Sequence, residues 1–532
     1  MKMWVEKNKY RIWYALCFFL LGVIDQRNGS AGGRTQMVFT NLTEVAIFGM
    51  LIPSVEKEFW KWKGLKIGAV VLSVASVFAC LIGDDYWGVA GQWYTAVLNV
   101  ALICVGILYI VWNRKNILES RRIGWGLLCF VMAIFVMMCL SVNRSVWPWW
   151  FMGMFGCVYL IGIPRCLWRD FFSGMMLGLV TWFTVQQMLA FGFRPYDYVR
   201  YRGMYNLETP SSVFYMVAFC AFICLWIQNK KDNSGHIARW GCYFLATVCV
   251  SFLFLTSGRS ALVGAVAAGI VAFMGYDIIF AKSFKHWLLQ GVALGVCSLV
   301  LLPVVYGCVR YLPTILHHPI WFQGDYNEET SVRSFDPWNS ERYISFDEVL
   351  YYDMGRILEM FGIRIQLEED EIDIESPLAL HVQAEEPGDS PENPFVVDAV
   401  YANQAATNSI NVRKTIYVYA LKHLNFKGHE NGALSFWVAS DEKFEGHAHN
   451  MYLQIAYSYG IVPGVLFLLW NIWCVIRLLR RKDVPGLCAA VFLVSVLGFG
   501  CTELAVKTGQ ITMTLLFLLY YFGMCRREED AA

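Results

Sequence analysis

The chain has 532 residues, of which 57% are hydrophobic and only 16% are charged. A soluble globular protein carries about 25% charged residues, so the composition excludes a soluble enzyme, a disordered chain and a disulfide scaffold. The net charge is +1 at pH 7, which leaves no overall basic field to attract nucleic acid. The sequence predicts an all-α polytopic membrane protein, a helix bundle embedded in the lipid bilayer.

Fourteen apolar runs approach the length of about 20 residues that a membrane-spanning helix needs. Eleven of these predicted spans fall within residues 1–307 and three within 449–532, before a short cytoplasmic tail. The segment 308–448 separates spans eleven and twelve. The runs cover residues 10–24, 38–54, 67–83, 92–112, 124–141, 146–164, 172–191, 211–228, 241–256, 260–280, 286–307, 452–475, 486–503 and 509–524.

The Lys and Arg residues predict the orientation of the bundle. With the N-terminus in the cytoplasm, the inside loops hold 25 of these residues and the short outside loops 8, and the other 10 lie in 308–448. Cytoplasmic loops carry the excess of Lys and Arg. Both termini are therefore predicted to be cytoplasmic and the long loop extracytoplasmic, with the loop at 192–210 as the weakest point of the assignment.

The long loop 308–448 differs from the rest of the chain. It has 24 acidic and 10 basic residues, a net charge of −14. Its middle, from Glu368 through Pro394 within the acidic region 366–400, is rich in proline and is expected to lack a core. Its end, Ser409–Asn425, has the apolar spacing of a helix.

Several kinds of chemistry have no sequence signal in this chain. There is no Walker loop, dinucleotide-binding glycine pattern, HExxH pair or nucleophile elbow. The cysteines lie in or beside apolar runs, where cysteine acts as a small hydrophobic residue. The sequence therefore predicts neither a cofactor nor a metal site.

The predicted outer loops contain an unexpected set of arginines. The eight basic residues of the short outer loops are seven Arg and one Lys. Arg makes bidentate contacts with phosphate, whereas Lys acts as a point charge. A single exposed Arg is ordinarily a headgroup contact or a structural ion pair, but the bias across the whole face indicates a site for an anionic, lipid-linked substrate. The candidates, including one from the end of the long loop, are Arg34, Arg200, Arg202, Arg259 and Arg413.

Arg259 stands in the turn Ser257-Gly-Arg-Ser260, just before a predicted helix with many small residues. Small residues allow helices to approach closely, so this packing is expected to hold Arg259 rigidly. The small residues are Ala261, Gly264, Ala265, Ala268 and Gly269.

Two histidines stand at the outer mouth of predicted span twelve. His447 and His449 are two positions apart and cannot share one helix face, so at most one is expected to point into the bundle. His449, next to Asn450, is the better candidate for a base, since histidine titrates near neutral pH. The alternative is an interfacial histidine that is hydrogen-bonded to a carbonyl group.

Four segments resemble the O-antigen ligase and O-antigen polymerase family. The most specific is the His449-Asn450-x-Tyr-Leu…Gly-Ile-x-x-Gly pattern, and Ser-Gly-Arg-Ser is the next. The chain departs from the family at residues 206–211, Asn-Leu-Glu-Thr-Pro-Ser, where the family tends to have Asn-Pro-Asn. The four segments are 200–206, 255–264, 411–432 and 447–464.

The resemblance implies a membrane glycosyltransferase that acts at the outer face of the bacterial cytoplasmic membrane without a metal or a nucleotide sugar. Its donor would be a polyprenyl-diphosphate-linked glycan and its acceptor a second glycan. His449 would be the base, and Arg259 and Arg413 would join it in catalysis. Arg34, Arg200, Arg202 and Asn450 would bind substrate. Contacts with other proteins of polysaccharide assembly are expected, and none with nucleic acid.

The chemistry agrees with this expectation, because a diphosphate is already a stable leaving group. The reaction needs one base to deprotonate the acceptor hydroxyl and positive charge at the leaving diphosphate, whereas a glycosidase usually needs two carboxylates. Three alternatives stay open: a ligase that moves a finished polymer to another acceptor, a lipid-oligosaccharide flippase, and a non-catalytic scaffold. A transporter often shows an internal repeat, and the sequence has none that we detect.

Overall fold

A computed structural model describes fifteen stretches of the chain. The predicted span 67–83 beyond its first two residues, the acidic stretch 366–400 and Asn206 lie outside them. The described residues are 2–30, 34–62, 65, 67–68, 99–119, 123–145, 147–194, 200–205, 207–281, 286–316, 346–350, 409–430, 432–437, 443–506 and 510–525.

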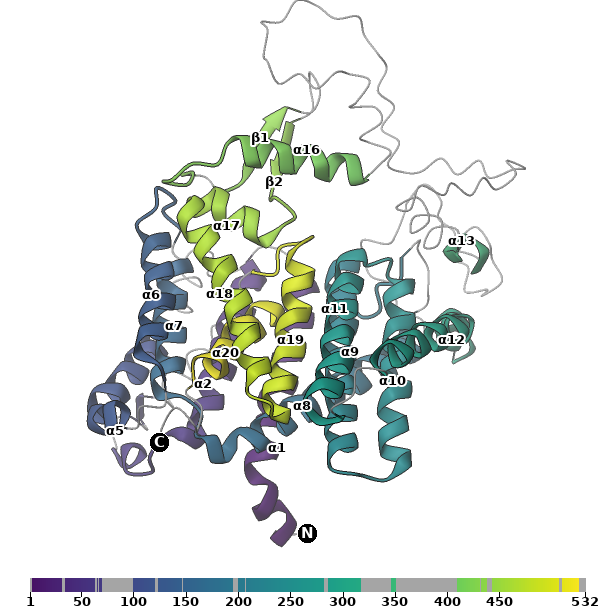
Figure 1. The fold of residues 1–532 in the computed structure, drawn as a ribbon, viewed down its shortest axis with the longest axis horizontal. Coiled ribbons are helices and arrows are strands. Elements are labelled where there is room, and N and C mark those ends of the chain that lie inside the picture. The colour runs from purple at the N-terminus through teal and green to yellow at the C-terminus, as the bar shows by residue number, and fades with distance from the viewer. Residues whose placement is uncertain are drawn as a thin grey trace, which may run out of the picture.

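The described part of the chain is a bundle of helices (Figure 1). Six helices are long and apolar enough to cross a membrane, which supports the predicted helical membrane protein, while the count of fourteen spans stays a prediction. These six cover Arg165–Phe193, Glu208–Lys231, His236–Leu255, Arg259–Ala281, Trp287–Pro313 and Ile461–Arg480. Shorter apolar helices cover Leu42–Ser54, Asn99–Trp112, Trp125–Cys139, Trp147–Ile161, Val484–Gly500 and Ile511–Met524.

The α-helices of Figure 1 have the following bounds. They are α1 (Lys2–Ser30), α2 (Arg34–Leu51), α5 (Arg114–Glu119), α6 (Trp125–Cys139), α7 (Trp147–Ile161), α8 (Trp168–Phe193), α9 (Glu208–Lys231), α10 (His236–Leu255), α11 (Arg259–Tyr276), α12 (Trp287–Ile315), α13 (Phe346–Leu350), α16 (Ser409–Lys422), α17 (Met451–Tyr459), α18 (Ile461–Arg480), α19 (Val484–Gly500) and α20 (Ile511–Met524). Short 3₁₀ turns cover Ile52–Ser54, Phe59–Lys61 and Arg165–Leu167, and a π turn, Asp277–Ala281, extends α11.

Helix α9 lies at the centre of the bundle. In its most apolar stretch of 18 residues, 89% of the residues are buried. The helix packs against α8, α10, α11 and α19. Its first turn holds Glu208 and its last turn Lys230 and Lys231, charges that favour the two ends of a helix dipole. The core of the bundle therefore forms where segments from the middle and the end of the chain meet.

The close packing predicted for the helix after Arg259 is confirmed. Helix α11 packs against α19, and a Cβ atom added at Gly264 would lie 2.5 Å from the carbonyl oxygen of Ser495. Ala261, Ala265 and Ala268 are buried. The small residues thus bring α11 against α19, while a rigid hold on Arg259 stays a prediction.

The chain following the long loop departs from the prediction of one span over 452–475. Two helices, α17 and α18, meet at Gly460, whose φ is +106°. A side chain is strained in that conformation, and a Cβ atom there would lie 2.4 Å from the carbonyl oxygen of Phe426. The glycine therefore ends α17, and α18 alone is long enough to span.

Two short strands, which the all-α prediction did not include, precede α17. Strands β1 (Leu434–Trp437) and β2 (Lys443–Gly446) pair antiparallel, with Leu434 opposite Gly446. The predicted helix at the end of the long loop is confirmed as α16. A small buried cluster joins α16, β1 and α17 into one cap at the upper end of the bundle in Figure 1. This cluster consists of Ile416, Ala420, Leu434, Ala448 and Tyr457.

Candidate functional site

The candidate site is the turn 447–450, between β2 and α17, together with the loop that follows α19. His449 has a φ of +45°, which is uncommon for a residue with a side chain, although histidine is among those more often found there. Hydrogen bonds hold the turn in this conformation. The Tyr417 hydroxyl donates to the carbonyl oxygen of His449 at 2.9 Å, and the N–H of Ala448 donates to Oε1 of Gln454 at 2.7 Å.

Asn450 ties this turn to the loop after α19. Its Oδ1 accepts hydrogen bonds from the N–H groups of Tyr452 and Leu453, both at 3.0 Å, and so caps α17. Its Nδ2 donates to the carbonyl oxygen of Cys501 at 2.8 Å. The amide predicted to bind substrate therefore positions the turn.

The loop after α19 carries Glu503, which the sequence analysis did not identify. Its N–H continues the helical pattern by donating to the carbonyl oxygen of Phe499 at 3.0 Å. Beyond Glu503, the carbonyl oxygen of Ala505 accepts a hydrogen bond from the hydroxyl of Thr512 in α20 at 2.9 Å. These hydrogen bonds anchor the backbone at Glu503 and at Ala505, just after it.

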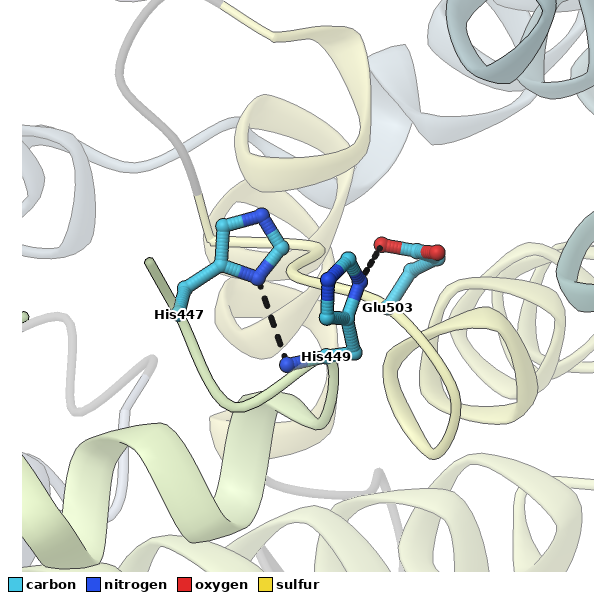
Figure 2. A group of neighbouring side chains, drawn as sticks. All are labelled: His447, His449 and Glu503. Carbon is cyan, nitrogen blue, oxygen red and sulfur yellow. Dashed lines mark hydrogen bonds and ion pairs between the residues drawn. The ribbon is translucent and has the colours of Figure 1, made fainter. Parts of the chain in front are cut away.

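Glu503 joins two of the predicted catalytic residues. Its Oε2 lies 3.1 Å from Nδ1 of His449 (Figure 2), and its Oε1 accepts a hydrogen bond from Arg413 at 2.7 Å. The side chain of Glu503 is 13% exposed and that of His449 30%. The structure thus brings His449 and Arg413 together through a carboxylate.

The protonation of Glu503 determines which nitrogen of His449 carries the proton. Burial by itself raises the pKa of Glu503, but the hydrogen bond from His449 and the charge of Arg413 hold that pKa below its ordinary value. An ionised carboxylate only accepts hydrogen bonds, so Nδ1 of His449 carries the proton in this contact. The lone pair of a neutral ring then lies on Nε2, which can accept a proton.

His447 also lies in this group. Its Nδ1 accepts a hydrogen bond from the backbone N–H of His449 at 3.2 Å, and the centres of the two rings are 4.2 Å apart. The expectation that at most one of the two histidines points into the bundle assumed that both lie on a helix, whereas ligand atoms of both rings lie within 4.8 Å of each other and of Glu503. Both residues precede α17, and a turn can direct both rings to the same side.

Arg259 lies beside the loop that carries Glu503. The hydroxyl of the next residue, Ser260, donates to the carbonyl oxygen of Thr502 at 3.5 Å. Arg259 itself is half-buried at the start of α11. Close packing of α11 and α19 therefore places the first turn of α11 beside the loop that carries Glu503.

Arg202 and Arg200 occupy the segment before α9. Arg202 pairs with Glu208 at 3.0 Å, with side chains that are 17% and 20% exposed, and Arg200 is half-buried. The N–H of Tyr201 donates to the carbonyl oxygen of Leu255 at 2.8 Å, which ties this segment to the end of α10, close to Arg259. Arg34 begins α2, but its side chain lies outside the described part of the structure.

Glu503 had a weak signal in the sequence. It is an acidic residue at the end of an apolar run, in Cys501-Thr-Glu503-Leu, and carboxylates near a membrane span are usually paired or functional. The predicted outer-face site rests on basic residues alone and therefore does not include Glu503.

Comparison with protein-family models, curated proteins and solved structures gives no match. The likeness to O-antigen ligases and polymerases therefore rests on the quoted motifs alone.

Proposed function

We propose that the chain is a membrane glycosyltransferase that transfers a glycan from a polyprenyl diphosphate to the hydroxyl of another glycan. The proposal draws on the family resemblance and on the geometry of the candidate site. One observation carries it: Nδ1 of His449 is held by Glu503 at 3.1 Å. This contact leaves Nε2 of His449 to act as the base. In the carboxylate–histidine pair of hydrolases, the carboxylate likewise orients the ring and fixes its tautomer.

In the proposed step, the acceptor hydroxyl oxygen attacks the anomeric carbon of the donor glycan. The hydroxyl proton passes to Nε2 of His449, the new C–O bond forms, and the bond between that carbon and the diphosphate breaks. Glu503 stabilises the positive charge that develops on the imidazole ring. The polyprenyl diphosphate leaves with the bonding electron pair.

The arginines have different tasks in this proposal. Arg259, next to the Glu503 loop, is the first donor to the diphosphate oxygens, and Arg202 and Arg200 extend the basic rim. Arg413 orients Glu503 and contributes further N–H groups, since an arginine has five donors and the ion pair to Glu503 uses one. Bidentate Arg contacts suit the charge on the departing diphosphate.

Among glycan transfers we favour a polymerase of a surface polysaccharide in the bacterial cytoplasmic membrane. The long loop has a net charge of −14 and would repel a phosphorylated lipopolysaccharide acceptor more than a neutral repeat unit. A ligase uses the same donor chemistry and is the second candidate. A flippase is the third.

The lipid-linked intermediates of a deletion strain test the proposal. Loss of a polymerase leaves single repeat units on the polyprenyl carrier, accessible at the outer face. Long chains on the carrier would mean a ligase instead, and single units confined to the cytoplasmic face would mean a flippase. Complementation with His449→Ala should leave the defect uncorrected while the protein level stays normal, and complementation with His447→Ala should correct most of it.

A further inference from the structure

The group that holds the proposed base also has the composition of a metal site. His447, His449 and Glu503 each offer one ligand atom, and these atoms all lie within 4.8 Å of one another (Figure 2). We propose that these three residues bind a zinc ion, which occupies the site in place of the hydrogen bond between His449 and Glu503.

The ligand types fit zinc, and so does the distance between the ligand atoms of His449 and Glu503. Two histidines and one glutamate form a common catalytic zinc set, with Zn–N and Zn–O distances of about 2.0–2.2 Å. Two such ligands at a tetrahedral angle lie about 3.3 Å apart, close to the 3.1 Å between Nδ1 of His449 and Oε2 of Glu503. All three residues are partly buried, and a tetrahedral ion with three protein ligands keeps a fourth position for water.

The surroundings of the three ligands are already ordered. Arg413 binds the other carboxylate oxygen of Glu503 at 2.7 Å, and such outer contacts orient metal ligands. Tyr417 and Asn450 fix the backbone at His449 and at the residue that follows it. The positive charge of Arg413 opposes a second cation nearby, so the site suits a reversibly bound ion better than a permanent one.

Zinc binding would switch off the proposed base, a consequence that rests on the proposed function. The ion takes the lone pair of Nδ1 in His449, and the proton of a neutral ring then resides on Nε2. A protonated Nε2 cannot accept the proton of an acceptor hydroxyl. The site would therefore make glycan transfer sensitive to free zinc.

Calorimetry on the purified full-length protein tests the site itself. After treatment with a chelator, the wild type should bind one equivalent of Zn²⁺. His447→Ala and Glu503→Gln should each weaken zinc binding at least about tenfold. Removal of a residue that only orients a metal ligand already lowers the affinity by about 10- to 100-fold, and removal of a ligand itself should lower it at least as much. His236→Ala, at the start of α10, is the matched control and should bind as the wild type does.

Cobalt provides a second readout that excludes the cysteines. Co²⁺ at the proposed site should show the visible bands of nitrogen and oxygen ligands, without a sulfur-to-cobalt charge-transfer band. A charge-transfer band, unchanged affinity in both site variants, or equal weakening in His236→Ala would overturn the proposal. Gel filtration and circular dichroism verify that each variant is folded.

The transfer assay separates the zinc site from the proposed function. If both hold, zinc inhibits the wild type, while His447→Ala retains transfer and resists inhibition. If the wild type binds zinc as described but transfers no glycan under any condition, the zinc site stands and the proposed function fails. Loss of transfer on chelation would overturn the inhibitory role.

Discussion

Glu503→Gln tests the role of the carboxylate with a change that keeps the size of the side chain. The amide loses the negative charge that faces Nδ1 of His449 at 3.1 Å and Arg413 at 2.7 Å. A hydrogen bond to a charged group contributes about 1.5–3 kcal/mol, and this one strengthens when the ring becomes positively charged during transfer. The transfer rate should therefore fall about 10- to 150-fold.

The assay measures single-turnover transfer from a defined polyprenyl-diphosphate glycan by the purified protein. Glu58→Gln is the control, because Glu58 is exposed and pairs with Lys61 at 3.4 Å far along the chain from the site residues. It should transfer as the wild type does. A folded Glu503→Gln protein with the wild-type rate would refute the assignment of His449 as a base held by Glu503.

Three further predictions address other parts of the molecule. Arg259→Lys keeps the positive charge but loses the planar guanidinium group that can make two parallel hydrogen bonds, so the transfer rate should fall at least about tenfold. A normal rate would show that Arg259 acts through its charge alone and not through bidentate binding. Gly460→Ala should lower the free energy of unfolding by at least about 1–3 kcal/mol, because φ is +106° there, whereas Gly241→Ala, where an added Cβ meets nothing within 4 Å, should not; equal melting temperatures would contradict the strained break between α17 and α18. A reporter fused after Ser390 should face outside and one after Arg481 the cytoplasm, and the reverse result would overturn the orientation.

Local patterns predicted the parts of the fold that depend on nearby residues. The apolar spacing of Ser409–Asn425 identified α16, and the small residues of α11 identified its tight contact with α19. Both features can be predicted because helix periodicity and small-residue spacing depend on residues within a few turns of one helix.

The candidate site depends on contacts between distant segments, and the sequence predicted it only in part. His449 and Arg413 were identified from their motifs, but their link through Glu503 joins residues 54 and 90 positions apart. The break at Gly460 was missed because the apolar run continues across it. Whether a glycine ends a helix there depends on the carbonyl of Phe426, which no local pattern contains.

The most direct test of the account follows glycan transfer by the purified protein from a polyprenyl-diphosphate donor to a second lipid-linked repeat unit. The wild type should form the lengthened product and release polyprenyl diphosphate in equal amount, in the presence of a chelator, and His449→Ala should form neither. Equal product from the wild type and from folded His449→Ala would contradict the account.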